Sequence, residues 1–142
     1  METLKIKRLN KWANAHSYYS IDVLRIVLGI FLLFKGFTFV SDNQQLEDVM
    51  APVSNFLGGM FALHYIVSAH IVGGILLIFG LYTRWAIWVQ LPILIGAVII
   101  NLIGYFNLQN TILSTVTLLV CFFFLIYGGG KNSADHYFKM EK

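Results

Sequence analysis

The chain has 142 residues, of which 58% are hydrophobic and only 12% charged, and its mean hydropathy is +0.72. These values lie outside the usual range of soluble domains and indicate a membrane protein. The formal net charge of +3 does not indicate nucleic-acid binding, because the basic residues flank apolar stretches and form no nucleic-acid motif. The single Cys121 excludes an intramolecular disulfide and a CxxC redox centre.

Residues 1–20 mix apolar with basic side chains. The basic ones are Lys5, Lys7, Arg8 and Lys11, and the apolar ones include Leu4, Ile6, Leu9 and Trp12. This mixture predicts an amphipathic segment on an anionic membrane surface. A cleavable signal peptide is not expected, because no small-residue cleavage site follows the first apolar run.

Four later stretches each reach the roughly 20 apolar residues that a membrane-spanning helix needs. They are residues 21–40, 62–82, 85–104 and 111–128. Because only Thr83 and Arg84 separate the second stretch from the third, these two are expected to fold back on each other. The predicted fold is an all-α membrane protein of one domain, an antiparallel bundle of four transmembrane helices with an amphipathic N-terminal segment.

The longest connection, residues 41–61, carries a helix-start signal of its own. Ser41 as N-cap and Gln44 at the capping-box position predict a short helix that ends at Pro52. The apolar, glycine-rich residues 53–61 are expected to lie on or dip into the outer membrane surface, with a plain linker as the alternative.

The placement of charge predicts how the bundle is oriented. One side of the predicted bundle holds the basic N-terminal segment, Arg84 and the tail lysines Lys131, Lys139 and Lys142. The loops on the other side hold Asp42, Glu47 and Asp48 but no Lys or Arg. Cytoplasmic loops are enriched in Lys and Arg, so both termini are predicted to be cytoplasmic.

Two stripes at helical spacing define faces of the predicted spans. In the first span, Arg25, Gly29, Leu32 and Gly36 follow i, i+4, i+7, i+11 spacing, and their small residues favour close helix packing. We expect that face to look inward. In the third span, Gln90, Leu94, Ala97 and Asn101 follow the same spacing, so its two amides share one stripe.

Polar residues inside the predicted membrane are candidates for a binding site. Counting from the outer helix ends places five of them at similar depths, namely Lys35, His64, His70, Asn101 and Ser114. Such donors suit a quinone carbonyl or an anionic lipid headgroup. The alternative is that they snorkel to the interface or hydrogen-bond between helices for stability.

A second group is predicted at the cytoplasmic end, as an ion-pair and amide cluster. Its members are Asp22, Arg25, Arg84, Gln90 and Asp135. Arg25 can snorkel to the surface or pair with Asp22, three residues earlier. We expect it to lie close enough to Asp135 to interact, which would clamp the tail beneath the bundle.

Metal and nucleotide chemistry are disfavoured. His64 and His70 are six residues apart, which places them roughly 120° apart around a helix and not on one face, as in an i, i+4 chelating pair. A haem site is disfavoured as well, although two helices could each supply one His ligand. The GGGKN turn is too short for a phosphate-binding loop, so no nucleotide is expected.

Three segments resemble the DoxX family of small four-helix bacterial membrane proteins. They are LRIVLGIFLLFKG (24–36), HIVGGILLIFGLYTR (70–84) and GGGKNSAD (128–135), which ends in Ser133 and Asp135. The chain departs from the family at His70, where many members carry an acidic residue before the paired glycines. A proton or cation role tied to that acid therefore does not transfer to this chain.

The resemblance implies a bacterial inner-membrane protein associated with quinone-linked oxidoreductases or with thiol and oxidative-stress systems. Two functional hypotheses follow. One is a quinone-linked redox accessory protein with a small, outward-facing polar pocket. The other is a non-catalytic structural or accessory subunit of a larger respiratory or export complex. Neither hypothesis assigns a catalytic residue.

Overall fold

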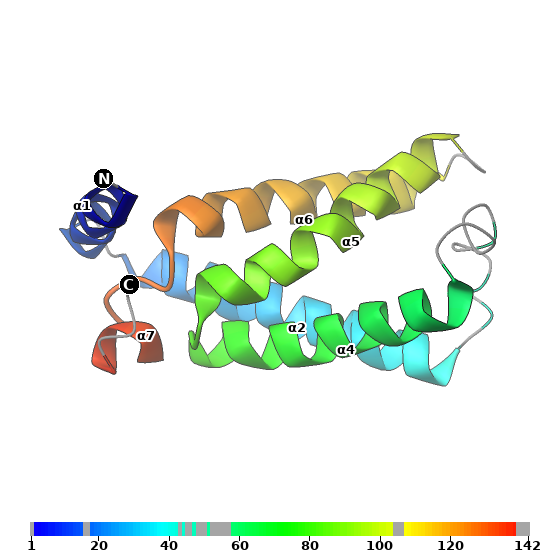
Figure 1. Cartoon of the computed structure of the whole chain (residues 1–142), viewed down its shortest axis with the longest axis horizontal. Helices are drawn as coiled ribbons and strands as arrows, with labels where there is room; N and C mark the ends of the chain where they lie inside the picture. Colours follow the sequence, from blue (N-terminus) through cyan, green and yellow to red (C-terminus); the bar gives the residue numbers. More distant parts are fainter. Residues whose placement is uncertain are drawn as a thin grey trace.

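The computed structural model describes residues 2–15, 18–42, 44, 47, 51, 58–103 and 107–138. Its helices are α1 (Glu2–Ala15), α2 (Tyr19–Ser41), α4 (Gly59–Phe79), α5 (Thr83–Ile103), α6 (Leu108–Tyr127) and α7 (Ala134–Tyr137) (Figure 1). No strand occurs in the described residues. Helices α2, α4, α5 and α6 are long and apolar enough to cross a membrane. The prediction of an all-α bundle of four spans is confirmed.

The four long helices pack as two pairs. Helix α2 packs against α4, α5 packs against α6, and α4 joins the pairs through its contact with α5. The turn from α4 to α5 lies at the same end of the bundle as α1 and α7, and we call this the turn end (Figure 1). The two pairs diverge toward the opposite end, which we call the loop end (Figure 1).

Helices α2 and α4 approach closely because glycine faces glycine. A Cβ atom on Gly29 would lie 2.8 Å from the Gly74 carbonyl oxygen, and a Cβ on Gly74 would lie 2.8 Å from the Gly29 oxygen. Small residues let backbones make extensive van der Waals contact where lipid provides no hydrophobic driving force. The predicted inward face is confirmed, because Arg25, Gly29, Leu32 and Gly36 are all buried.

A glycine turn ends α4 three residues earlier than the predicted span. Gly80 is left-handed (φ +66°), and Leu81 N–H donates to the Leu76 carbonyl at 2.8 Å. This is the hydrogen-bond pattern of a Schellman C-cap. Helix α5 starts directly after the turn, at Thr83. Thr83 and Arg84 therefore belong to the first turn of α5 and are not the linker that the sequence suggested.

The core lies between the two pairs, where Leu32, Leu77, Ile87 and Phe124 are fully buried. Large apolar side chains such as Phe34, Trp88 and Leu119 cover the outside and are exposed. An apolar exterior around a packed interior is what lipid requires of a spanning bundle.

The predicted capping box at Ser41 is wrong. Ser41 is the last residue of α2, and Asp42 N–H still donates to the Thr38 carbonyl at 2.8 Å. Gln44 and Glu47 are helical. The rest of the predicted short helix and most of the predicted surface segment, including Pro52, lie outside the described residues.

Candidate functional site

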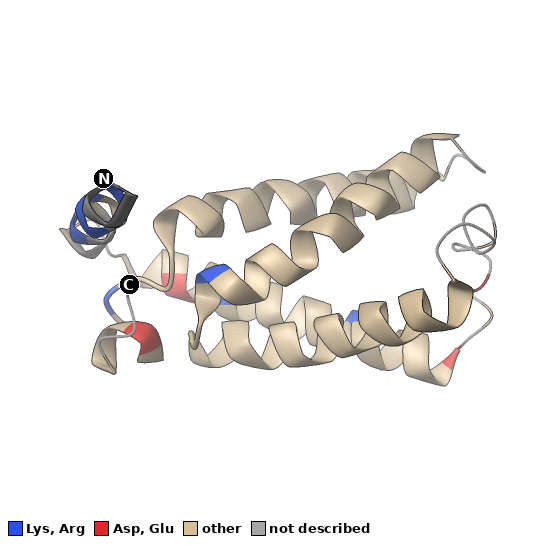
Figure 2. Cartoon of the chain, in the orientation of Figure 1, with Lys and Arg blue, Asp and Glu red and all other residues tan. Residues whose placement is uncertain are grey.

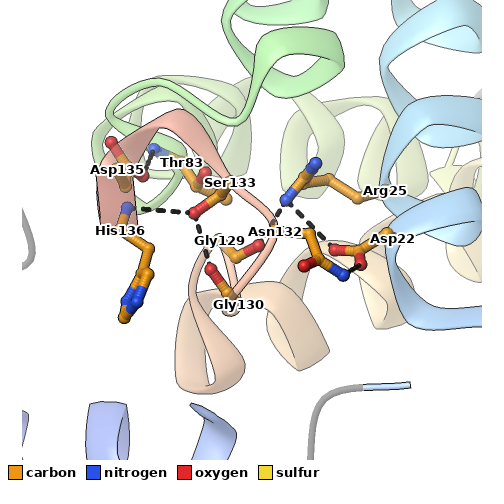
Figure 3. Close-up of polar contacts among 9 residues, drawn as sticks. All are labelled: Asp22, Arg25, Thr83, Gly129, Gly130, Asn132, Ser133, Asp135 and His136. Atoms are coloured by element: carbon orange, nitrogen blue, oxygen red, sulfur yellow. Dashed lines mark hydrogen bonds and ion pairs between the residues drawn. The ribbon is translucent and has the colours of Figure 1, made fainter. Parts of the chain in front are cut away.

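The turn end holds a partly buried ion pair. Arg25 is 3% exposed, and its Nη1 lies 3.5 Å from Asp22 Oδ1. The same nitrogen donates to the Gly129 carbonyl oxygen, across the bundle (Figure 3). The predicted Asp22–Arg25 contact is confirmed, and the guanidinium also binds the turn that follows α6.

Asp135 contacts the bundle through backbone groups. Its Oδ1 accepts from Tyr82 N–H at 2.5 Å, and its Oδ2 accepts from Thr83 N–H at 2.9 Å. Its own N–H donates to the Gly80 carbonyl at 2.9 Å. The tail is therefore clamped beneath the bundle by the α4–α5 turn. Asp135 also lies close enough to Arg25 to interact electrostatically, as expected, although its hydrogen bonds are with the backbone of this turn.

Three further residues complete this cluster, and sequence reasoning missed them. Asn132 Nδ2 donates to Asp22 Oδ2 at 2.7 Å. Ser133 Oγ donates to the Gly130 carbonyl at 2.7 Å and accepts from His136 N–H at 3.3 Å as the N-cap of α7 (Figure 3). Thr83 is fully buried beside them. The available sequence signal for this cap was a serine directly before a short helix.

Arg84 and Gln90 each donate a hydrogen bond to a backbone carbonyl of a neighbouring helix. Arg84 Nη2 donates to the Ile126 carbonyl at 3.2 Å, which ties the start of α5 to the end of α6. Gln90 lies about 10 Å further into the bundle, at about 1.5 Å per residue from Thr83. The predicted membership of Gln90 in the turn-end cluster is therefore wrong.

Gln90 instead links α5 to α4 inside the membrane-spanning region. It is fully buried, and its Nε2 donates to the Ala69 carbonyl at 2.6 Å. A Cβ atom on Gly73 would lie 2.5 Å from that same nitrogen, so the glycine makes room for the amide. The described residues offer its Oε1 no hydrogen-bond partner.

His70 lies near the middle of α4 and faces α2. It is 5% exposed, its Nδ1 lies 2.9 Å from the Ile66 carbonyl oxygen, and its ring meets Phe39 edge-on at 5.6 Å between centroids. A Cβ on Gly36 would lie 3.2 Å from His70 Cβ, so the neighbouring Lys35 is at the level of His70 along the bundle. The lysine is close enough to interact electrostatically with the imidazole.

The other three predicted pocket residues are His64, Ser114 and Asn101. His64 is exposed, with Nδ1 at 2.8 Å from the Met60 carbonyl, and Ser114 Oγ donates to the Asn110 carbonyl at 2.8 Å. Asn101 is buried but lies about 16 Å beyond Gln90 along α5, at about 1.5 Å per residue. Because Gln90 packs at the level of Ala69, Asn101 is about three helical turns from His70. The predicted common depth is wrong for Asn101.

The sequence comparison decides the family. The DoxX family model matches residues 20–102, which covers α4 and nearly all of α2 and α5. The chain belongs to the DoxX family. No curated protein and no solved structure matches it. With its four apolar helices, this DoxX protein is a multi-pass integral membrane protein.

Proposed function

We propose that this DoxX protein binds a quinone or quinol headgroup beside His70 and acts as an accessory protein of a quinone-linked redox system. The proposal includes the bacterial inner membrane as its location, with the turn end in the cytoplasm. It puts the polar site at the level of Lys35 and His70, near the middle of α4.

The observation that carries the proposal is the hydrogen bond of the buried imidazole. A carbonyl oxygen can only accept, so the contact with Ile66 assigns the proton to Nδ1 and leaves Nε2 of the neutral ring as an acceptor. A quinol presents two O–H donors, and a quinone presents two carbonyl acceptors. His70 Nε2 suits the quinol hydroxyl, and the Lys35 ammonium suits the oxygen of either form.

The surroundings of this pair also suit such a ligand. The Phe39 ring packs at His70, and an aromatic wall fits a flat headgroup. An isoprenoid tail leaves between helices into lipid without crossing water. The chain supplies binding and proton exchange in this proposal, and the electrons come from the redox partner that the quinone serves.

The test is quinone recovery from purified protein. Lipid extracts of the wild type in native-lipid nanodiscs should contain quinone by mass spectrometry. Lys35→Met should reduce its recovery at least about tenfold, the equivalent of one lost charged hydrogen bond, and His70→Leu about fivefold, the equivalent of one lost neutral hydrogen bond. His64→Leu is the matched control, because His64 makes the same i−4 carbonyl contact but is exposed. Full recovery in His70→Leu, with unchanged thermal stability, would remove the quinone site.

A structural or accessory subunit of a larger membrane complex is the second candidate. The roles of Gln90 and Asp135 favour this candidate. Both side chains hydrogen-bond the backbone of another helix within the chain, which is a structural role. Stoichiometric co-purification with a larger complex, in preparations that contain no quinone, would support this function instead.

A further inference from the structure

The N-terminal helix lies across the end of the bundle. In Figure 1, α1 is seen almost along its own axis, whereas the spanning helices run along the length of the picture. Its axis is therefore roughly perpendicular to theirs. A helix in this orientation, at the end of four membrane spans, lies in the plane of the membrane surface.

This helix has one strongly basic face. Lys7, Arg8 and Lys11 fall within about 100° of arc, at about 100° per residue. All three are exposed. Leu9 and Trp12, three residues apart, define another face about 120° away by the same spacing. Leu9 is 38% and Trp12 52% exposed, so apolar surface remains available beside the cations.

An aromatic contact joins α1 to the bundle. The Trp12 ring meets the Tyr127 ring edge-on, with 6.5 Å between centroids. Tyr127 is the last residue of α6 and is 3% exposed. This contact sets α1 at the level where the apolar part of α6 ends, which is the depth of lipid headgroups for a spanning helix.

We propose that the Lys7–Lys11 face of α1 binds anionic phospholipid headgroups of the membrane that the bundle crosses, with Trp12 at the interface. Charge complementarity supports this occupant, because α1 carries four cations and Glu2 as its sole acid. The depth of the helix favours lipid over an acidic protein. At the membrane surface the basic face contacts anionic headgroups while the apolar face contacts the acyl chains. This binding is independent of a quinone site at His70.

Trp12 itself provides the probe. The chain has three tryptophans, so Trp85→Phe combined with Trp88→Phe leaves Trp12 as the sole indole. This full-length protein is reconstituted into nanodiscs of phosphatidylcholine alone or with added phosphatidylglycerol. In the anionic bilayer, Trp12 emission should shift to the blue and be quenched by brominated lipid, and high salt should reverse both changes.

Variants of the basic face test whether the positive charge of these side chains, and not their size, causes the lipid effect. Lys7→Gln with Lys11→Gln should weaken the anionic-lipid effect by about fivefold for each lost cation. Lys7→Arg with Lys11→Arg should keep it, and so should Lys131→Gln, which removes an exposed charge from the turn after α6. Equal quenching in both bilayers and at all salt concentrations would overturn the proposal. So would strong acrylamide quenching of Trp12 in both bilayers, which would point to a soluble partner.

Discussion

At position 73 the bundle has no room for a methyl group. A Cβ there would lie 2.5 Å from Gln90 Nε2, which donates to the Ala69 carbonyl. Gly73→Ala should displace the amide and leave buried polar atoms without partners. We expect the free energy of unfolding in detergent to fall by about 1–3 kcal/mol.

Gly96 offers a matched control for this substitution. It lies in the adjoining helix α5, and a Cβ there would meet nothing within 4 Å. Gly96→Ala should be neutral or stabilising by up to about 1 kcal/mol, because alanine favours helix. The Gly73→Ala loss should also shrink in a Gln90→Ala background, where the displaced amide is absent. An equal loss in both backgrounds would show that Gln90 is not the obstacle.

At the scale of single helices, the sequence predicts which face of a helix is buried better than it predicts which residues that face contacts. The stripe of Arg25, Gly29 and Gly36 was predictable because helical periodicity is a local property, and all three residues are buried. The spans were predictable because each is a long apolar run. The identity of the residues that meet between helices depends on where the helices end.

The error over Gln90 and Asn101 shows this dependence. The turn at Gly80 ends α4 at Phe79 and starts α5 at Thr83, which sets Gln90 against Ala69. Counting depth from the edges of the apolar runs misses this register. It therefore placed Gln90 with the turn-end cluster and Asn101 level with His70. The backbone partners of Asp135 had no side-chain signal at all.

The contact between the tail and the α4–α5 turn gives a prediction at this scale. Asp135 accepts from the backbone N–H groups of Tyr82 and Thr83 at the start of α5, where a helix favours negative charge. In Asp135→Asn, one oxygen becomes an amino group that faces an N–H donor. The free energy of unfolding should fall by about 1–3 kcal/mol.

The size of this loss distinguishes a cap from an ion pair. Removing one partner of a buried ion pair costs about 3–5 kcal/mol, but Arg25 keeps Asp22 and the Gly129 carbonyl in this variant. Glu47→Gln, an exposed carboxylate replaced by its amide, is the control and should change stability little. A loss in Asp135→Asn no greater than in the control would show that the two hydrogen bonds do not hold the turn.

For the whole molecule, the distribution of charge favours one orientation in the membrane. Among the described residues, every Lys and Arg except Lys35 lies at the turn end, on α1, at Arg25 and Arg84, or at Lys131 (Figure 2). The described part of the loop end carries Asp42 and Glu47. The same bias that orients other membrane proteins would hold the turn end in the cytoplasm, where the anionic leaflet proposed for α1 is also found.

This orientation predicts which engineered cysteines react in intact cells. Gln44→Cys and Gln109→Cys, at exposed positions of the loop end, should label with a membrane-impermeant maleimide. Ala15→Cys and Tyr137→Cys, exposed at the turn end, should label after the cells are opened.

Gln109 is preferable to Asn107, whose side chain accepts from Asn110 N–H at 3.1 Å and caps α6. Native Cys121 is fully buried and supplies the unreactive background. Labelling of Ala15→Cys in intact cells, with Gln109→Cys silent, would reverse the bundle and place α1 on the outer leaflet.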